Sequence, residues 1–298
     1  MSAFPITFSI PENKIIKTLP IKTKVVSSLI PGDLTTYIYD TETDYYNEYR
    51  LSFFAKTTKK AGWDCMRHYE ILANGCIPYF PNIEQCPPNT MALLPKELII
   101  EGNALYEKYK NTNINDLLKE NIEEMNLLIT KLLKYTRDFL TTAKIAKYIL
   151  KKTGFEKITS ILYLSGDIGP DYLRCVTLQG FKEMFGMYCH DYPKIPHIYK
   201  TDFLNYNSYY GKGITYTNNV DEKLHNNEFD NSIETDIKLK KYDIIIYGSF
   251  HRGMPFYDLI SQIYLPNEII LLCGEDIHQS DCSNMWTSKG HNVFVREA

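Results

Sequence analysis

The sequence predicts an α/β protein with two lobes, each organised around a parallel sheet. Three apolar segments of the second half have the composition of buried strands, and each ends in a turn that contains glycine: residues 161–165, 242–247 and 268–273. Apolar residues recur at helical spacing through 103–152 and again through 171–185. Strands that alternate with helices form parallel sheets with helices on their faces. The expected architecture is therefore α/β with parallel sheet, and the strand, turn and helix that open the second half predict a Rossmann-like unit.

We place the boundary between the two lobes after residue 152. The last helix of the first half ends in Lys151, Lys152 and Gly154, and cations followed by glycine are typical of a helix C-terminus. This division gives a first lobe of residues 1–152 and a second lobe of residues 153–298.

In the first lobe, the initial 50 residues have the composition of short strands and turns, with a turn at 31–33 and a strand at 35–39. A strand at 51–55 comes next. The following helix ends before Gly75, which suits the left-handed position after a helix, and a strand at 77–80 follows. A short apolar run at 98–100 precedes the long helical region.

In the second lobe, the strand at 161–165 is followed by a turn at 166–171 and an amphipathic helix that ends near Phe185. This turn is not a GxGxxG sequence, so it predicts no dinucleotide site. Residues 200–240 show little periodicity and predict an irregular excursion. The strands at 242–247 and 268–273 flank a turn in which Pro255 suits the first position of a helix, and 293–295 predicts a last strand.

Composition narrows the classes of function. The net charge of −3 offers no basic field for nucleic acid, so we expect no nucleic-acid partner. The seven cysteines include no CxxC pair, and this favours a reducing, cytoplasmic location over a disulfide framework. No window approaches the ~18 apolar residues of a membrane span, and the N-terminus lacks the basic and apolar regions of a secretion signal. We expect a soluble protein.

The segment 59–78 concentrates residues that bind phosphates and sugars. The N-terminus of its helix, near Gly62 and Trp63, would offer backbone N–H groups to a diphosphate. Cations and hydroxyl acceptors adjoin it, and the candidate residues for donor binding are Lys59, Lys60, Trp63, Arg67, His68 and Glu70. Arg67 and Glu70 lie three residues apart on one helical face, so the alternative is an ordinary salt bridge on the surface of the helix.

These residues also carry a resemblance. Cys65, Arg67 and Glu70, followed by Gly75 and Pro78, resemble the donor-site signature of exostosin-like glycosyltransferases. The similarity covers roughly 30 residues and is greatest to short members encoded by large algal viruses, which include xylosyltransferase-like proteins. It implies a GT-B fold, which is a pair of Rossmann-like lobes that face a cleft. It also implies a UDP-sugar donor, a glycan acceptor, inversion at the anomeric carbon, and no metal or other cofactor.

The position of the motif departs from the family pattern. In that family the acceptor domain comes first and the donor motif lies near the end of the chain, whereas here the motif begins near residue 59. Two explanations follow. Either the order of the lobes is permuted, or the N-terminal region contributes strands to a sheet that is completed elsewhere.

Candidate catalytic groups lie after two predicted strands. Asp167 could act as the general base that deprotonates an acceptor hydroxyl, although a turn or N-cap aspartate is an equally simple interpretation. His251 is the second candidate base, and its alternative is a surface histidine in a capped turn. The residues expected to contact the acceptor or a phosphate are Gly166, Ser249, Arg252 and Asp276.

A third cluster, with Glu275, Asp276 and His278, permits two other interpretations. It could suggest a metal, but the two acids are adjacent and need not converge, so we expect none. It could also imitate the carboxylates and histidine of a nucleotide-sugar epimerase. A non-catalytic carbohydrate- or nucleotide-binding module is a further alternative. Aromatic residues that could stack on a sugar are Trp63, Tyr45, Tyr46, Tyr209 and Tyr210.

Overall fold

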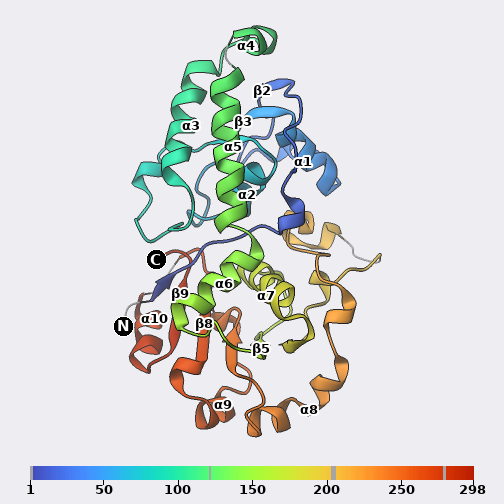
Figure 1. Ribbon diagram of the computed structural model, residues 1–298, viewed down its shortest axis with the longest axis vertical. Coiled ribbons are helices and arrows are strands. Elements are labelled where there is room, and N and C mark those ends of the chain that lie inside the picture. Colours follow the sequence, from blue (N-terminus) through green and yellow to red (C-terminus); the bar gives the residue numbers. More distant parts are fainter. Residues whose placement is uncertain (1–2, 121, 203–205, 278–279) are drawn as a thin grey trace.

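The computed structural model describes residues 3–120, 122–202, 206–277 and 280–298 and divides them between two lobes (Figure 1). Each lobe contains a parallel sheet, one of three strands and one of six. This arrangement confirms the predicted α/β class and its pair of sheets. No helix among the described residues is long and apolar enough to cross a membrane.

The smaller sheet belongs to the first lobe and has the order β2-β3-β4. Its strands are β2 (Lys24–Val26), β3 (Ser52–Lys56) and β4 (Ile77–Tyr79). The helices of this lobe are α1 (Glu42–Arg50), α2 (Met66–Ala73), α3 (Lys96–Tyr109), α4 (Ile114–Glu120) and α5 (Ile122–Phe139). The predicted strand, helix and strand of the motif segment are thus β3, α2 and β4, with Gly75 at φ +63° after the helix.

The larger sheet has the order β1-β9-β8-β7-β5-β6. Its strands are β1 (Phe4–Pro5), β5 (Ile161–Leu164), β6 (Cys189–Tyr192), β7 (Ile244–Tyr247), β8 (Ile269–Cys273) and β9 (Asn292–Val295). The strands expected at 161–165, 242–247, 268–273 and 293–295 are confirmed as β5, β7, β8 and β9. Around this sheet lie α6 (Thr142–Thr153), α7 (Tyr172–Phe185), α8 (Asn227–Lys238), α9 (Tyr257–Ile263) and α10 (Ser280–Ser288).

The side of the sheet to which the chain adds its next strand changes at β5. From β5 the chain adds β6 on one side, whereas β7, β8 and β9 extend the sheet on the other. Loops that leave such a point diverge and open a crevice at the carboxyl ends of the strands, where α/β proteins bind ligands. The turns that follow β5 and β7 are the ones that carry the candidate bases.

The N-terminus belongs to the larger sheet. Phe4 and Pro5 of β1 pair in parallel with Phe294 and Val295 of β9, so the first strand lies beside the last one (Figure 1). The chain then enters the first lobe and returns through α5 and α6, and the two crossing segments touch at the bridge between Ile10 and Thr141. Of the two explanations for the position of the motif, this pairing supports a sheet completed by N-terminal residues.

Two expectations for the first 50 residues are wrong. The predicted strand at 35–39 is instead a 3₁₀ turn over Leu34–Thr36, capped by the Asp33 carboxylate. Residues 42–50 form a helix rather than strands and turns, because the Thr41 side chain accepts a hydrogen bond from the Asp44 N–H and caps it. The apolar run at 98–100 lies within α3.

The excursion at 200–240 is only partly irregular. Short 3₁₀ turns occupy much of it, but α8 begins after Asn226, whose side chain accepts from the Glu228 N–H. Ile233 and Ile237 are buried on one face of α8. Four-residue spacing of two apolar residues is a weak signal in a polar sequence, and this explains why periodicity did not predict the helix.

Candidate functional site

A cleft of about 1400 Å³ lies between the lobes. The first lobe contributes Tyr37, Arg67 and Glu70 to its lining, and the second contributes Tyr172, His251 and Glu275, among others. Pockets for single small ligands usually measure ~300–1,000 Å³. The cleft is therefore large enough for two reactants that meet between the lobes.

Arg67 is a buried cation in this cleft. The residue is only 7% exposed, and its Nε and Nη1 atoms have no hydrogen-bond partner among the described residues. Its guanidinium carbon lies 5.9 Å from the ring centroid of Tyr37. A buried charged group whose N–H donors are unpaired destabilises the fold. Arg67 is thus placed to bind an anion that enters the cleft.

Glu70 is buried beside Arg67 but is engaged by other partners. Its two carboxylate oxygens accept hydrogen bonds from the Tyr45 hydroxyl (2.8 Å) and the Thr215 hydroxyl (2.6 Å). Burial raises the pKa of this carboxyl group. Among the described residues no ion pair joins Glu70 to Arg67, and both residues are buried. The two residues therefore do not form the surface salt bridge that was the alternative interpretation of the sequence. Glu70 instead connects α2 to α1 and to the second lobe.

The helix N-terminus does not offer the backbone groups that the sequence predicts. The N–H groups of Trp63 and Asp64 both donate to the side-chain carboxylate of Glu297, at 3.0 and 2.9 Å. The helix itself begins at Met66, with Cys65 as its N-cap. A carboxylate of the chain therefore takes the two N–H groups nearest the predicted diphosphate position. Glu297 lies more than 230 residues away in sequence, so no local pattern predicts this contact.

The remaining candidates for donor binding divide between the cleft and the core. Lys60 lines the cleft. Lys59 lies over the Trp63 ring, with its Nζ atom 5.1 Å from the ring centroid, and both Lys59 and Trp63 are outside the lining. His68 is fully buried: its Nε2 donates to the Trp63 carbonyl and its Nδ1 lies 2.9 Å from the Thr57 hydroxyl. Burial lowers the pKa of His68 to about 4. The location of His68 is that of a structural residue.

Three of the aromatic residues proposed for stacking do line the cleft: Tyr45, Tyr209 and Tyr210. Tyr46 does not, because it is buried with its hydroxyl 2.6 Å from the Thr215 hydroxyl. Trp63 also lies outside the lining and packs near Phe80, with 6.0 Å between the ring centroids.

Asp167 is held by cations and lies outside the cleft lining. Its carboxylate accepts from Arg174 Nη1 at 3.0 Å, from the Gly169 N–H at 2.9 Å and from Arg252 Nη1 at 3.3 Å. Partial burial opposes ionisation, but the hydrogen bond and charge of Arg174 outweigh it, and the pKa of Asp167 falls below its usual value. A carboxylate stabilised in this way is a weak base. The turn interpretation therefore describes Asp167 better.

Asp171 organises the two turns at the switch point. One of its oxygens caps α7 by accepting from the Arg174 N–H at 3.0 Å. The other accepts from the Ser249 hydroxyl at 2.8 Å and from Arg252 Nε at 3.0 Å. Arg252 lines the cleft, whereas Ser249 is buried outside the lining. Sequence reasoning did not single out Asp171, although an aspartate before a helix is a capping signal.

Gly166 serves the same two turns by its lack of a side chain. A Cβ atom on Gly166 would lie 2.2 Å from the Arg252 carbonyl oxygen. The turn after β5 can therefore approach the turn after β7 only with glycine at this position. Gly166 packs the switch point, and it is not in the lining of the cleft.

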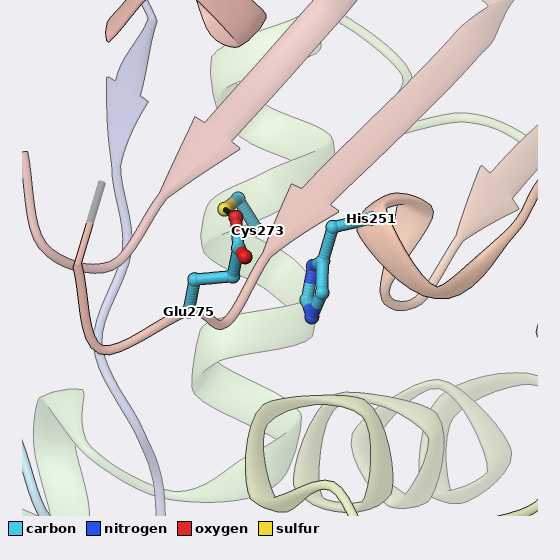
Figure 2. Close-up of side chains that lie close together, drawn as sticks. All are labelled: His251, Cys273 and Glu275. Carbon is cyan, nitrogen blue, oxygen red and sulfur yellow. Dashed lines mark hydrogen bonds between the residues drawn. The ribbon is translucent and has the colours of Figure 1, made fainter. Parts of the chain in front are cut away.

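His251 and Glu275 line the cleft from the second lobe, and Cys273 lies beside them (Figure 2). One ligand atom from each of the three side chains lies within 4.8 Å of the other two. Burial lowers the pKa of His251, and its Nδ1 is buried without a hydrogen-bond partner among the described residues. Asp276 also lines the cleft and is paired with Arg296. His278 lies outside the described residues.

The geometry thus brings a buried arginine, several tyrosines and a histidine to one cleft. It leaves Asp167, Ser249, Gly166, Trp63, Lys59 and His68 outside the lining. Comparison with protein-family models, with curated proteins and with solved structures found no match to this chain.

Proposed function

We propose that this protein is an inverting glycosyltransferase that moves a sugar from a UDP-sugar to a hydroxyl group of a glycan. The observation that carries the proposal is Arg67, a buried guanidinium in the lining of an interlobe cleft whose Nε and Nη1 have no partner in the part of the chain that the structure describes. A diphosphate supplies the charge and the acceptor oxygens that such a group lacks. The resemblance at Cys65, Arg67 and Glu70 points to the same ligand.

Each lobe contributes one part of the proposed reaction. Arg67 and Lys60 neutralise the diphosphate as it leaves, which is electrostatic stabilisation of the transition state and needs no metal. Glu70 holds the lobes around the donor through Thr215, and Tyr45 of its own lobe keeps the carboxylate in place. Tyrosine rings of the lining offer faces for a base or a sugar.

His251 is the proposed general base. It lines the cleft from the lobe opposite Arg67, whereas Asp167 is ion-paired outside the lining. A base on the far side of the donor suits an in-line displacement with inversion. Among sugars, xylose is the first to test, because it follows from the resemblance.

We also propose that the protein acts in the cytoplasm. Among the described residues, five cysteines are free thiols: Cys65, Cys76, Cys86, Cys175 and Cys189. Thiols that remain unpaired are typical of reducing compartments.

The binding test compares wild type with Arg67→Met, a variant that keeps an unbranched side chain and removes the charge. UDP, GDP, UDP-xylose and UDP-glucose are added singly and the melting temperature is measured. A ligand at ~100 times its dissociation constant adds about 2.7 kcal/mol to the free energy of unfolding. We expect shifts with the UDP compounds in wild type and none in Arg67→Met.

The matched control is Arg137→Met. Arg137 is a half-buried arginine of α5, and it hydrogen-bonds the Ile16 carbonyl far from the cleft. The melting temperature of the Arg137→Met variant should rise with UDP as that of wild type does. Absence of any shift in folded wild type would contradict the proposal. Binding without sugar transfer to any glycan would instead support the non-catalytic module.

A further inference from the structure

His251, Cys273 and Glu275 come together because of the sheet topology. Cys273 is the last residue of β8, Glu275 lies two residues later, and His251 follows β7. The strands β7 and β8 are parallel neighbours, with Tyr247 opposite Leu271, so their carboxyl ends lie at one edge of the sheet. Figure 2 shows the three side chains gathered at these strand ends.

The three ligand atoms are close to the spacing that a metal ion requires. They lie within 4.8 Å of one another, and Cys273 Sγ is 3.7 Å from the nearer oxygen of Glu275. Ligands of tetrahedral zinc, at about 2.0–2.3 Å from the ion, lie roughly 3.5 Å apart. Closing the site around an ion requires small side-chain rotations of Glu275 and His251, both of which line the cleft.

The chemistry of the set selects the kind of ion. Thiolate and imidazole prefer zinc and other borderline-soft cations, whereas Mg²⁺ and Ca²⁺ prefer sites made of oxygens alone. Cys273 is 2% exposed, but His251 and Glu275 line the cleft, and they give an ion a route to the thiol. On binding, the thiol loses its proton to solvent and the thiolate joins the ion.

We propose that His251, Cys273 and Glu275 form a site for Zn²⁺ or a similar thiophilic divalent cation, with the fourth coordination position open to the cleft. Three protein ligands and one open position are the arrangement of zinc sites that bind an exchangeable molecule. The sequence predicts no metal, since Glu275 and Asp276 are adjacent and need not converge. Cys273 and His251 change this prediction, because the end of β8 itself supplies the thiol and the turn after the neighbouring strand β7 supplies the imidazole.

The site does not depend on the function proposed above. Arg67 lies on the other lobe, and the transfer reaction as proposed needs no metal. An ion held by His251 would occupy the nitrogen that otherwise accepts the proton, so the loaded protein would transfer sugar more slowly. Metal binding is therefore tested directly, by a spectroscopic signal that does not depend on sugar transfer.

The test is a Co²⁺ titration of the metal-free protein. Cobalt bound by a thiolate gives a charge-transfer band in the near ultraviolet, and we expect this band to saturate at one Co²⁺ per chain and to disappear on addition of Zn²⁺. Cys273→Ala should abolish the band. Glu275→Gln should weaken Co²⁺ binding at least ~10-fold, since even outer-shell changes have effects of this size.

The matched control is Cys189→Ala. Cys189 is a fully buried cysteine of β6 in the same sheet. Its replacement shows whether removal of any buried thiol of this sheet changes the band or the folding of the protein. Its band should equal that of wild type. The proposal is overturned if folded wild type gives no charge-transfer band, or if the band persists in Cys273→Ala. Circular dichroism of each variant verifies that it is folded.

Discussion

At the scale of single residues, Arg67 illustrates a conflict between stability and binding. Its Nε and Nη1 are buried without partners among the described residues, and we expect this to destabilise the ligand-free fold. Functional sites often retain such groups because the ligand supplies the missing interactions. The stability of the ligand-free protein therefore reports on the role of this residue.

We predict that Arg67→Met raises the free energy of unfolding of the ligand-free protein by about 1–3 kcal/mol, the penalty of the unpaired buried donors that it removes. Urea unfolding without nucleotide measures it. A loss of stability in Arg67→Met would mean that the guanidinium holds the fold together, and it would weaken the case for an anion site.

His68 makes stability depend on pH. Burial lowers its pKa from the ordinary 6.5 to about 4 in the folded protein. Between these values the unfolded chain binds a proton that the folded chain does not, so stability falls as pH falls from 6.5 to 4. The slope for one histidine is about 1.4 kcal/mol per pH unit.

We expect the free energy of unfolding of wild type to fall relative to that of His68→Gln as pH decreases across this range, since glutamine does not titrate. Urea unfolding at several pH values measures the difference between the two proteins. If the two proteins lose stability with pH in parallel, the His68 imidazole has the same pKa in the folded and the unfolded state, and the prediction is wrong.

At the scale of elements, the turns after β5 and β7 depend on close contact. Gly166→Ala would place a Cβ 2.2 Å from the Arg252 carbonyl oxygen and 2.6 Å from the Gly253 Cα, both of them backbone atoms. We predict a loss of about 1–3 kcal/mol in unfolding free energy. Differential scanning calorimetry measures the change.

Gly169→Ala is the matched control within the same turn. A Cβ there would meet its nearest neighbour, Asp167 Oδ1, at 3.5 Å, which is ordinary contact. Its melting temperature should stay close to that of wild type. Equal losses in the two variants would mean that glycine is needed for flexibility of the turn rather than for the approach to Arg252.

Elements differ in how well the sequence predicts them. The buried strands β5, β7 and β8 were predicted because they are continuous apolar runs that end in glycine-containing turns. The helix α1 was not, because Tyr45, Tyr46 and Tyr49 favour strands by intrinsic preference. Their burial against the first lobe and the Thr41 cap outweigh this preference.

At the scale of the whole molecule, the segment 209–217 of the second lobe is bonded to the first. Thr215 donates its hydroxyl hydrogen to Glu70 and its backbone N–H to Glu42, at 2.6 and 2.8 Å. Lys212 pairs with Asp40 at 2.6 Å. Thr215 also adopts φ +76°, an uncommon backbone conformation for a β-branched residue. These contacts keep the lobes close around the cleft.

We predict that Thr215→Val destabilises the protein by about 1–3 kcal/mol, because it leaves one oxygen of the buried Glu70 carboxylate without its partner. Urea unfolding measures the loss. Thr217→Val is the control, since the Thr217 hydroxyl donates to the nearby Gly213 carbonyl and to no residue of the first lobe that the structure describes. A smaller loss in Thr215→Val than in the control would mean that the contact between the lobes adds little stability.

The sequence by itself determined the α/β class, the buried strands of the second lobe and the helix that carries Arg67 and Glu70. These features follow from local patterns of apolar residues, caps and glycines. It also placed Arg67 and His251 among the candidates, since both lie in segments that adjoin strands.

Only the tertiary structure decided which candidates meet. Glu297 at the start of α2, Thr215 at Glu70, β1 beside β9 and Cys273 beside His251 all join positions that are distant in sequence. Such contacts depend on strand order and on the approach of the two lobes. A local pattern holds no information on either, because each is set by the packing of the whole chain.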